Sequence, residues 1–122
     1  MTKLQNVAVV SVPVSDQDRA KSFYVDTLGM RVLLDDTSES GMRWVQVAPP
    51  EGATSLTLVT WFDSMPPGSL RGLVLSSTNL ETDYAELMRK GVEFEGPPQQ
   101  RPRGIETVLR DPDGNRIVLN QS

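Results

Sequence analysis

An internal repeat is the feature that most constrains how this chain can fold. A predicted helix that ends at Gly29 has a counterpart that ends at Gly91, and these two glycines lie 62 positions apart. In each half of the chain, one predicted strand precedes the helix and three predicted strands follow it. Two βαβββ modules of similar length predict an α+β fold in a pseudo-twofold arrangement, with a curved mixed sheet that encloses a cavity.

The first repeat, about residues 5–62, combines β-branched stretches with one capped helix. Ser15 or Asp16 can cap this helix at its start, and Gly29 can end it in a left-handed conformation. The predicted strands cover residues 7–14, 30–35, 42–48 and 55–62, with a turn at 36–41.

The second repeat, about residues 70–120, follows a central loop at 63–69. Asn79 is predicted to cap a helix over 80–90, and the sequence Asp-Pro-Asp-Gly-Asn at 111–115 is typical of a tight turn. The predicted strands cover residues 70–76, 92–95, 104–110 and 116–120. We expect residues 1–122 to form a single domain, because a chain of this length is too short for two independent cores.

The chain contains no cysteine and no histidine. Disulfide frameworks, zinc fingers, thiol catalysis and Ser-His-Asp catalysis are therefore excluded. Any acid–base role would fall to Asp, Glu, Lys or Tyr, since histidine is the usual group that titrates near neutral pH.

The charge pattern argues against two classes of partner. The net charge is −4, and the twelve Lys and Arg residues are scattered rather than clustered. A nucleic-acid partner is not expected, because phosphate binding needs a concentrated basic face. The apolar stretch at residues 7–14 is too short for a membrane span, and we expect a cytoplasmic protein.

Several short motifs occur in an order that resembles a known superfamily. They are the segment Val14–Ala20 after the first strand, then Phe23-Tyr24, then Leu28-Gly29, and finally the turn at 111–115 before the last strand. Together with the internal repeat, this arrangement resembles the vicinal oxygen chelate superfamily, which includes glyoxalase I, extradiol dioxygenases, fosfomycin-resistance enzymes and bleomycin-resistance proteins. The resemblance covers essentially the whole chain and implies the two-module fold given above.

Enzymes of that superfamily usually hold a divalent metal through two residues from each half. The resemblance places the four ligand positions at Val9, Thr57, Gly72 and Val118. Among these residues only Thr57 has a donor atom, a weakly ligating hydroxyl. We therefore expect no metal and no other cofactor, and an apolar cavity where the metal would have been.

A mostly apolar cavity with a few polar groups is the usual form of a small-molecule site. Trp44, Trp61 and Phe62 are candidates to contact an aromatic ligand, although either tryptophan could instead pack in the core. The polar candidates are Ser11, Thr57, Gln46, Glu106 and Arg103, where Glu106 could instead form a salt bridge and Arg103 belongs to a predicted mobile lip at 101–104.

Three functional hypotheses follow from these residues. The first is a binding protein without catalytic activity that holds a hydrophobic or aromatic small molecule, as the antibiotic-sequestering bleomycin-resistance proteins do; the resemblance also implies a homodimer. The second is an enzyme of the glyoxalase or dioxygenase kind, with displaced ligands or no metal, in which Gln46, Glu106 and Asp35 would be the groups to suspect. The third is an accessory protein with a vestigial cavity.

Overall fold

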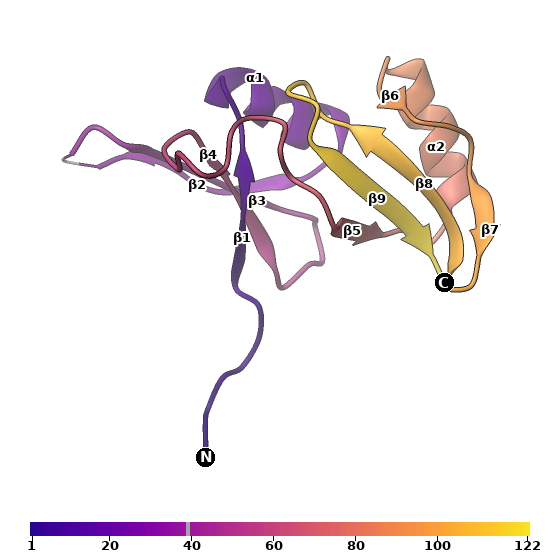
Figure 1. Cartoon of the computed structure of the whole chain (residues 1–122), viewed down its shortest axis with the longest axis horizontal. Coiled ribbons are helices and arrows are strands. Elements are labelled where there is room, and N and C mark those ends of the chain that lie inside the picture. The colour runs from indigo at the N-terminus through magenta and orange to yellow at the C-terminus, as the bar shows by residue number, and fades with distance from the viewer. Residues whose placement is uncertain (39) are drawn as a thin grey trace. The chain divides into compact units, whose positions relative to one another are not determined.

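The computed structural model describes residues 1–38 and 40–122, which form two compact units, Met1–Trp61 and Phe62–Ser122. Each unit contains one mixed sheet and one helical segment, and both share the order βαβββ, to which the second unit adds the short strand β7 (Gln99–Arg101) after its helix (Figure 1). The predicted α+β class and the internal repeat are confirmed by this common order of elements.

The first unit builds a four-stranded sheet in the order β1-β4-β3-β2. Strand β1 pairs with β4 in parallel, whereas β4–β3 and β3–β2 are antiparallel pairs. The elements are β1 (Val9–Pro13), α1 (Gln17–Ser22), η1 (Phe23–Thr27), β2 (Arg31–Thr37), β3 (Arg43–Ala48) and β4 (Ser55–Val59).

Helix α1 starts where the sequence predicts and then widens into a π-helical turn that the sequence did not predict. The Asp16 side chain accepts a hydrogen bond from the Arg19 amide at 3.1 Å, which makes Asp16 the cap. Within η1, Tyr24 is fully buried and its ring lies edge-on to the ring of Phe23. Gly29 follows with a φ of 80°, the left-handed conformation expected at this helix end.

The core of the first unit lies between its sheet and α1, which packs against β3 and β4. Every residue of β4 is buried, as are Val45 and Val47 on β3. The Gln17 side chain joins the helix to the sheet by donating to the carbonyl oxygens of Arg43 and Leu58, at 2.8 and 2.9 Å. These contacts hold one face of the sheet against the helix and leave the other face for the candidate site.

The second unit repeats this topology, with a main path of β5-β9-β8-β6 and β7 also paired to β8. Asn79 caps α2 by accepting from the Thr82 amide at 3.2 Å, as predicted, and α2 packs against β9. The elements are β5 (Leu73–Ser76), α2 (Leu80–Arg89), β6 (Glu93–Phe94), β7 (Gln99–Arg101), β8 (Gly104–Arg110) and β9 (Arg116–Gln121).

The turn at 111–115 is held by buried side chains. Asp111 accepts hydrogen bonds from the amides of Asp113 and Asn115, and its second carboxylate oxygen accepts from Asn115 Nδ2 at 2.8 Å. Asn115 is fully buried, and its Oδ1 accepts from the amide of Leu70 at 3.0 Å. The predicted turn is confirmed, and it also anchors the segment that leads into β5.

Several predicted boundaries were wrong. Strand β4 ends at Val59, so Trp61 and Phe62 follow the strand instead of ending it. Strand β5 begins only at Leu73, and β2 extends to Thr37 into the expected turn at 36–41, of which residue 39 lies outside the described part. The segment 101–104, predicted as a mobile lip, forms the turn of the β7–β8 hairpin, where backbone pairing continues to Arg101 and Gly104.

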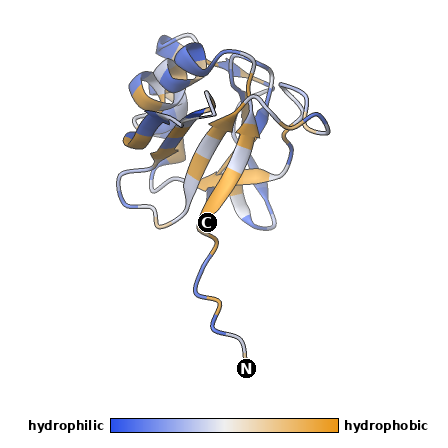
Figure 2. Cartoon of the chain, turned by 90° about the vertical axis from the view of Figure 1, so that its left-hand side faces the viewer, coloured by the Kyte–Doolittle hydropathy of each residue, from blue (hydrophilic) through white to orange (hydrophobic). Residues whose placement is uncertain are grey.

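Residues 1–8 precede β1 without helix or strand and are exposed (Figure 2). Leu4 and Val7 in this segment are 91% and 62% exposed, which leaves their apolar side chains without a core. In the part of the chain that the structure describes, no helix is long and apolar enough to cross a membrane.

Candidate functional site

Four predicted site residues lie on the face of the first sheet that points away from α1. The register pairs Ser11 with Thr57 and Thr57 with Gln46, and residues paired across strands point to the same side of a sheet. Trp44 lies two positions before Gln46 on β3 and therefore shares its side. We call the surface formed by Ser11, Trp44, Gln46 and Thr57 the Trp44 face.

The two tryptophans of the chain form a stacked pair beside this face. Their ring centroids are 6.2 Å apart, and the ring planes differ by 26°. Trp44 remains 38% exposed, a large aromatic surface that the first unit leaves uncovered. An offset pair of this kind stabilises the orientation of both indoles and offers a rigid flat surface for a further ring.

Gln46 is held in one orientation by hydrogen bonds at both ends of its amide. Trp44 Nε1 donates to its Oε1 at 2.9 Å, and its Nε2 donates to Ser55 Oγ at 2.6 Å. Ser55 in turn donates to the carbonyl of Ala8 at 3.1 Å. This chain of bonds links the exposed indole to the buried strand β4, so the Trp44 side chain is positioned before any ligand arrives.

Thr57 has a different environment. The residue is 1% exposed, and its hydroxyl has no hydrogen-bond partner among the described residues. A buried hydroxyl without a partner costs about 1–3 kcal/mol, and such groups in native proteins call for an explanation. The Thr57 hydroxyl is therefore a polar group beneath the Trp44 face that still needs a hydrogen-bond partner.

The other three predicted site residues belong to the second unit. Phe62 is 45% exposed. Glu106 is only 13% exposed at its side chain and forms a salt bridge with Arg103 at 2.9 Å, the alternative that the sequence left open for it. Asn120, which the sequence analysis did not single out, also donates to Glu106 at 2.9 Å.

The four positions that the resemblance assigns to metal ligands do not suit a divalent metal. Val9, Gly72 and Val118 have no side-chain donor, and the fourth, Thr57, offers one neutral hydroxyl. In residues 1–38 and 40–122, no three acidic side chains gather where they could share a metal ion. The donor set of this chain therefore does not fit the metal of the related enzymes.

Asp35, one of the groups suspected of a catalytic role, is held in a network of ion pairs. Asp35 accepts from Arg43 Nε and Nη2, both at 2.9 Å, and from Lys21 Nζ at 2.7 Å. The Arg43 and then the Lys21 hydrogen bonds hold the pKa of Asp35 far below its ordinary value. A carboxylate fixed as an anion between two cations is a poor proton acceptor, and it links α1 to β2 and β3 instead.

Two polar residues that bond to predicted site residues, Ser55 to Gln46 in the first unit and Asn120 to Glu106 in the second, were not predicted from the sequence. Ser55 lies two positions before Thr57 on β4, and its alternation with Thr57 was the signal that could have placed it on the Trp44 face. Asn120 is the cross-strand partner of Glu106, and only the pairing of β8 with β9 reveals this.

A sequence model of the Glyoxalase/Bleomycin resistance protein/Dioxygenase superfamily matches residues 6–119. The structure is similar to that of TnmS3, an antibiotic binding protein from Streptomyces sp. CB03234, with 49% identity, 99% of this chain and 98% of that chain covered, and a TM-score of 0.93. A glyoxalase/bleomycin resistance protein from the same strain is 51% identical, with 95% and 100% covered and a TM-score of 0.86. The protein YetH of Bacillus subtilis (strain 168) is 29% identical over 97% of this chain and 99% of its own length. The chain therefore belongs to the glyoxalase/bleomycin resistance protein/dioxygenase superfamily.

Proposed function

We propose that this protein binds a planar aromatic small molecule on the Trp44 face and sequesters it without catalysing a reaction. The observation that carries the proposal is the exposed indole of Trp44, which is held by Gln46 and stacked on Trp61, on the same sheet face as the buried, unpartnered hydroxyl of Thr57. A flat ring would stack on Trp44, and a polar atom at the edge of that ring would hydrogen-bond to Thr57 once the atoms that cover this hydroxyl move aside.

The chemistry of the site favours binding over turnover. Gln46 and Asp35, two of the groups that a reaction could use, are fully engaged with neighbouring side chains. Glu106, the third, is paired with Arg103 and Asn120. Three of the four metal-ligand positions, Val9, Gly72 and Val118, also have no side-chain donor, which disfavours a reaction through a bound metal.

The relatives support a ligand of antibiotic type. TnmS3 is described as an antibiotic binding protein, and it shares 49% of its residues with this chain over nearly its whole length. We extend this description to the present chain as antibiotic sequestration, with the protein located in the cytoplasm. Fractionation of the source cells would test the location, and growth inhibition in a host with and without the expressed gene would test protection.

Intrinsic tryptophan fluorescence provides a direct assay. The chain contains two tryptophans, and both belong to the stacked pair, so their emission reports on this site alone. Titration with a panel of naphthoquinone, phenazine, flavonoid and anthracycline compounds is expected to quench the emission saturably for at least one class. Isothermal titration calorimetry would then give the stoichiometry.

Matched variants separate binding at the Trp44 face from nonspecific adsorption. Trp44→Leu and Thr57→Val should each lower the affinity for the bound compound about tenfold, which corresponds to about 1.4 kcal/mol. Tyr84→Leu removes an aromatic ring from the Tyr84–Phe94 pair of the second unit and should leave the affinity unchanged. Failure of every compound in the panel to quench the emission, or equal loss in all three variants, would refute the proposal.

We also propose that the protein is a homodimer. Strand β2 is exposed along its whole length, and its three consecutive apolar residues Val32, Leu33 and Leu34 are 40%, 41% and 45% exposed. Strand β2 lies at the edge of its sheet, and an exposed apolar edge strand favours association with another chain. Light scattering coupled to size-exclusion chromatography should give twice the 13.5 kDa chain mass, and a monomer at micromolar concentration would contradict this.

A further inference from the structure

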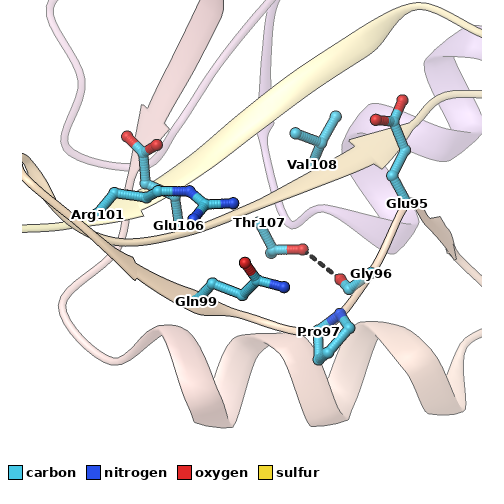
Figure 3. A pocket seen from close by; sticks show the side chains of 8 residues that line it. All are labelled: Glu95, Gly96, Pro97, Gln99, Arg101, Glu106, Thr107 and Val108. Atoms are coloured by element: carbon cyan, nitrogen blue, oxygen red, sulfur yellow. Dashed lines mark hydrogen bonds between the residues drawn. The ribbon is translucent and has the colours of Figure 1, made fainter.

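The second unit contains a pocket of about 200 Å³ beside strands β7 and β8 (Figure 3). Its lining comes from the second unit alone: Glu95, Gly96, Pro97, Gln99, Arg101, Glu106, Thr107 and Val108. Strands β6 and β7 both pair with β8, and the pocket lies where the segment between β6 and β7 departs from that strand. The Thr107 hydroxyl donates to the carbonyl of Gly96 at 2.6 Å, which ties the segment between β6 and β7 to strand β8.

One polar row crosses the sheet at this pocket. Gln99 is paired with Glu106 across β7 and β8, and Glu106 is paired with Asn120 across β8 and β9. The next row on β8 and β9 is apolar, with Val108 paired to Val118. The sheet therefore presents hydrogen-bonding groups directly beside an apolar strip, a combination that suits a ligand with polar edges and an apolar face.

The polar groups divide into a fixed acceptor and uncommitted donors. Arg103 and Asn120 hold the Glu106 carboxylate in place and leave part of its acceptor capacity unused. By contrast, the side chains of Gln99 and Arg101 make no hydrogen bond or ion pair with any described residue. Figure 3 shows the Gln99 amide lying between β7 and β8, and both Gln99 and Arg101 line the pocket.

The charges of the lining disfavour a charged ligand. An anion drawn to Arg101 would approach the carboxylates of Glu95 and Glu106, while a cation drawn to Glu106 would approach Arg101. Glu95 is further committed to Arg116 and Arg110, and its hydrogen bond with Arg116 is the main reason that its pKa lies below the ordinary value. A neutral group that both donates and accepts hydrogen bonds meets no such repulsion.

The size of the pocket limits the ligand to about one ring. Sites for drug-sized molecules occupy roughly 300–1,000 Å³, which exceeds the 200 Å³ available here. We propose that this pocket binds a neutral, polyhydroxylated ring of the sugar type. Its hydroxyls donate to Glu106 and accept from Gln99 and Arg101, while its C–H face packs on Val108 and Pro97.

Binding is tested by recording amide chemical shifts of the full-length protein during titration with the methyl pyranosides of glucose, galactose and mannose. At least one of them should produce saturable shifts at residues 99–101 and 106–108, with millimolar affinity. Sodium phosphate and methylammonium chloride, titrated separately, should produce none. Absence of saturable shifts with all three pyranosides, or saturation by phosphate or methylammonium alone, overturns the proposal.

Substitutions test whether the pyranoside binds in this pocket. Glu106→Ala and Arg101→Ala should each lower the affinity for the pyranoside about tenfold, because each removes hydrogen bonds between the sugar and a charged side chain. Glu93→Ala is the control, since the exposed Glu93 of β6 pairs with Arg110 and is not part of the lining. Trp44→Leu should also retain the affinity, so failure of the aromatic-ligand proposal leaves this one standing. Equal weakening in Glu106→Ala and Glu93→Ala would contradict the assignment.

Discussion

Replacement of Asn115 by alanine tests whether the turn at 111–115 holds the second unit together. Asn115 is fully buried, and Asp111 is 5% exposed. The substitution removes the hydrogen bond from Asn115 Nδ2 to the Asp111 carboxylate, which is worth about 1.5–3 kcal/mol because one partner is charged. It also removes the acceptor of the Leu70 amide, a further cost of about 1 kcal/mol because this amide is only partly shielded from water.

The expected loss is therefore about 3 kcal/mol of unfolding free energy. With an unfolding entropy of about 2.1 cal/mol/K per residue and 122 residues, this loss corresponds to a melting temperature lower by about 12 °C. Differential scanning calorimetry measures the temperature, and urea unfolding monitored by circular dichroism measures the free energy.

A double-mutant cycle with Asp111→Ala identifies the source of the loss. The two substitutions together should cost at least about 1 kcal/mol less than the sum of the single substitutions, because they remove both partners of one bond. Asn6→Ala, in the exposed N-terminal segment, should change the stability by less than about 0.5 kcal/mol. A loss below about 1 kcal/mol for Asn115→Ala, or strict additivity, would refute the reasoning.

Three further substitutions have expected outcomes. Because hydrogen bonds from Arg43 and Lys21 hold the pKa of Asp35 far below its ordinary 3.8, the stabilisation from this carboxylate is present above about pH 4 and declines as the pH falls further. Asp35→Asn should therefore lower the urea midpoint more at pH 7 than at pH 2.5, and an equal loss at both would contradict this. Gly104→Ala should destabilise severely and disturb the β7–β8 hairpin amide signals, because Gly104 has a φ of 124° and a Cβ there would collide with the carbonyl oxygen of Gln121; a native melting temperature would show that the hairpin tolerates it. Asn79→Ala removes the cap of α2 and should cost about 1 kcal/mol by urea unfolding, whereas no change would mean that the cap does not stabilise the helix.

The helices and most strands could be predicted because their signals are local. Asp16 and Asn79 lie directly before apolar periodic segments, and each cap is made with an amide three residues along the chain. The π-helical turn at Phe23–Thr27 could not be predicted in the same way, because no local residue type specifies the wider turn. Strand β7 was missed because Gln99–Arg101 has no apolar alternation, and its pairing with β8 alone makes it a strand.

The sequence by itself determined the repeat, the superfamily and the absence of ligand atoms at three of the four expected metal positions, because these depend on residue identity and order. Tertiary structure decided which polar groups are free to act. The pairing of three strands brings Ser11, Thr57 and Gln46 onto one face and leaves the Thr57 hydroxyl buried without a partner among the described residues. Similarly, the Glu106 carboxylate is held from two sides because β9 brings Asn120 beside it, in addition to the nearby Arg103. Burial and cross-strand contacts arise between residues that are distant along the chain, and this is why residue order alone could not assign these roles.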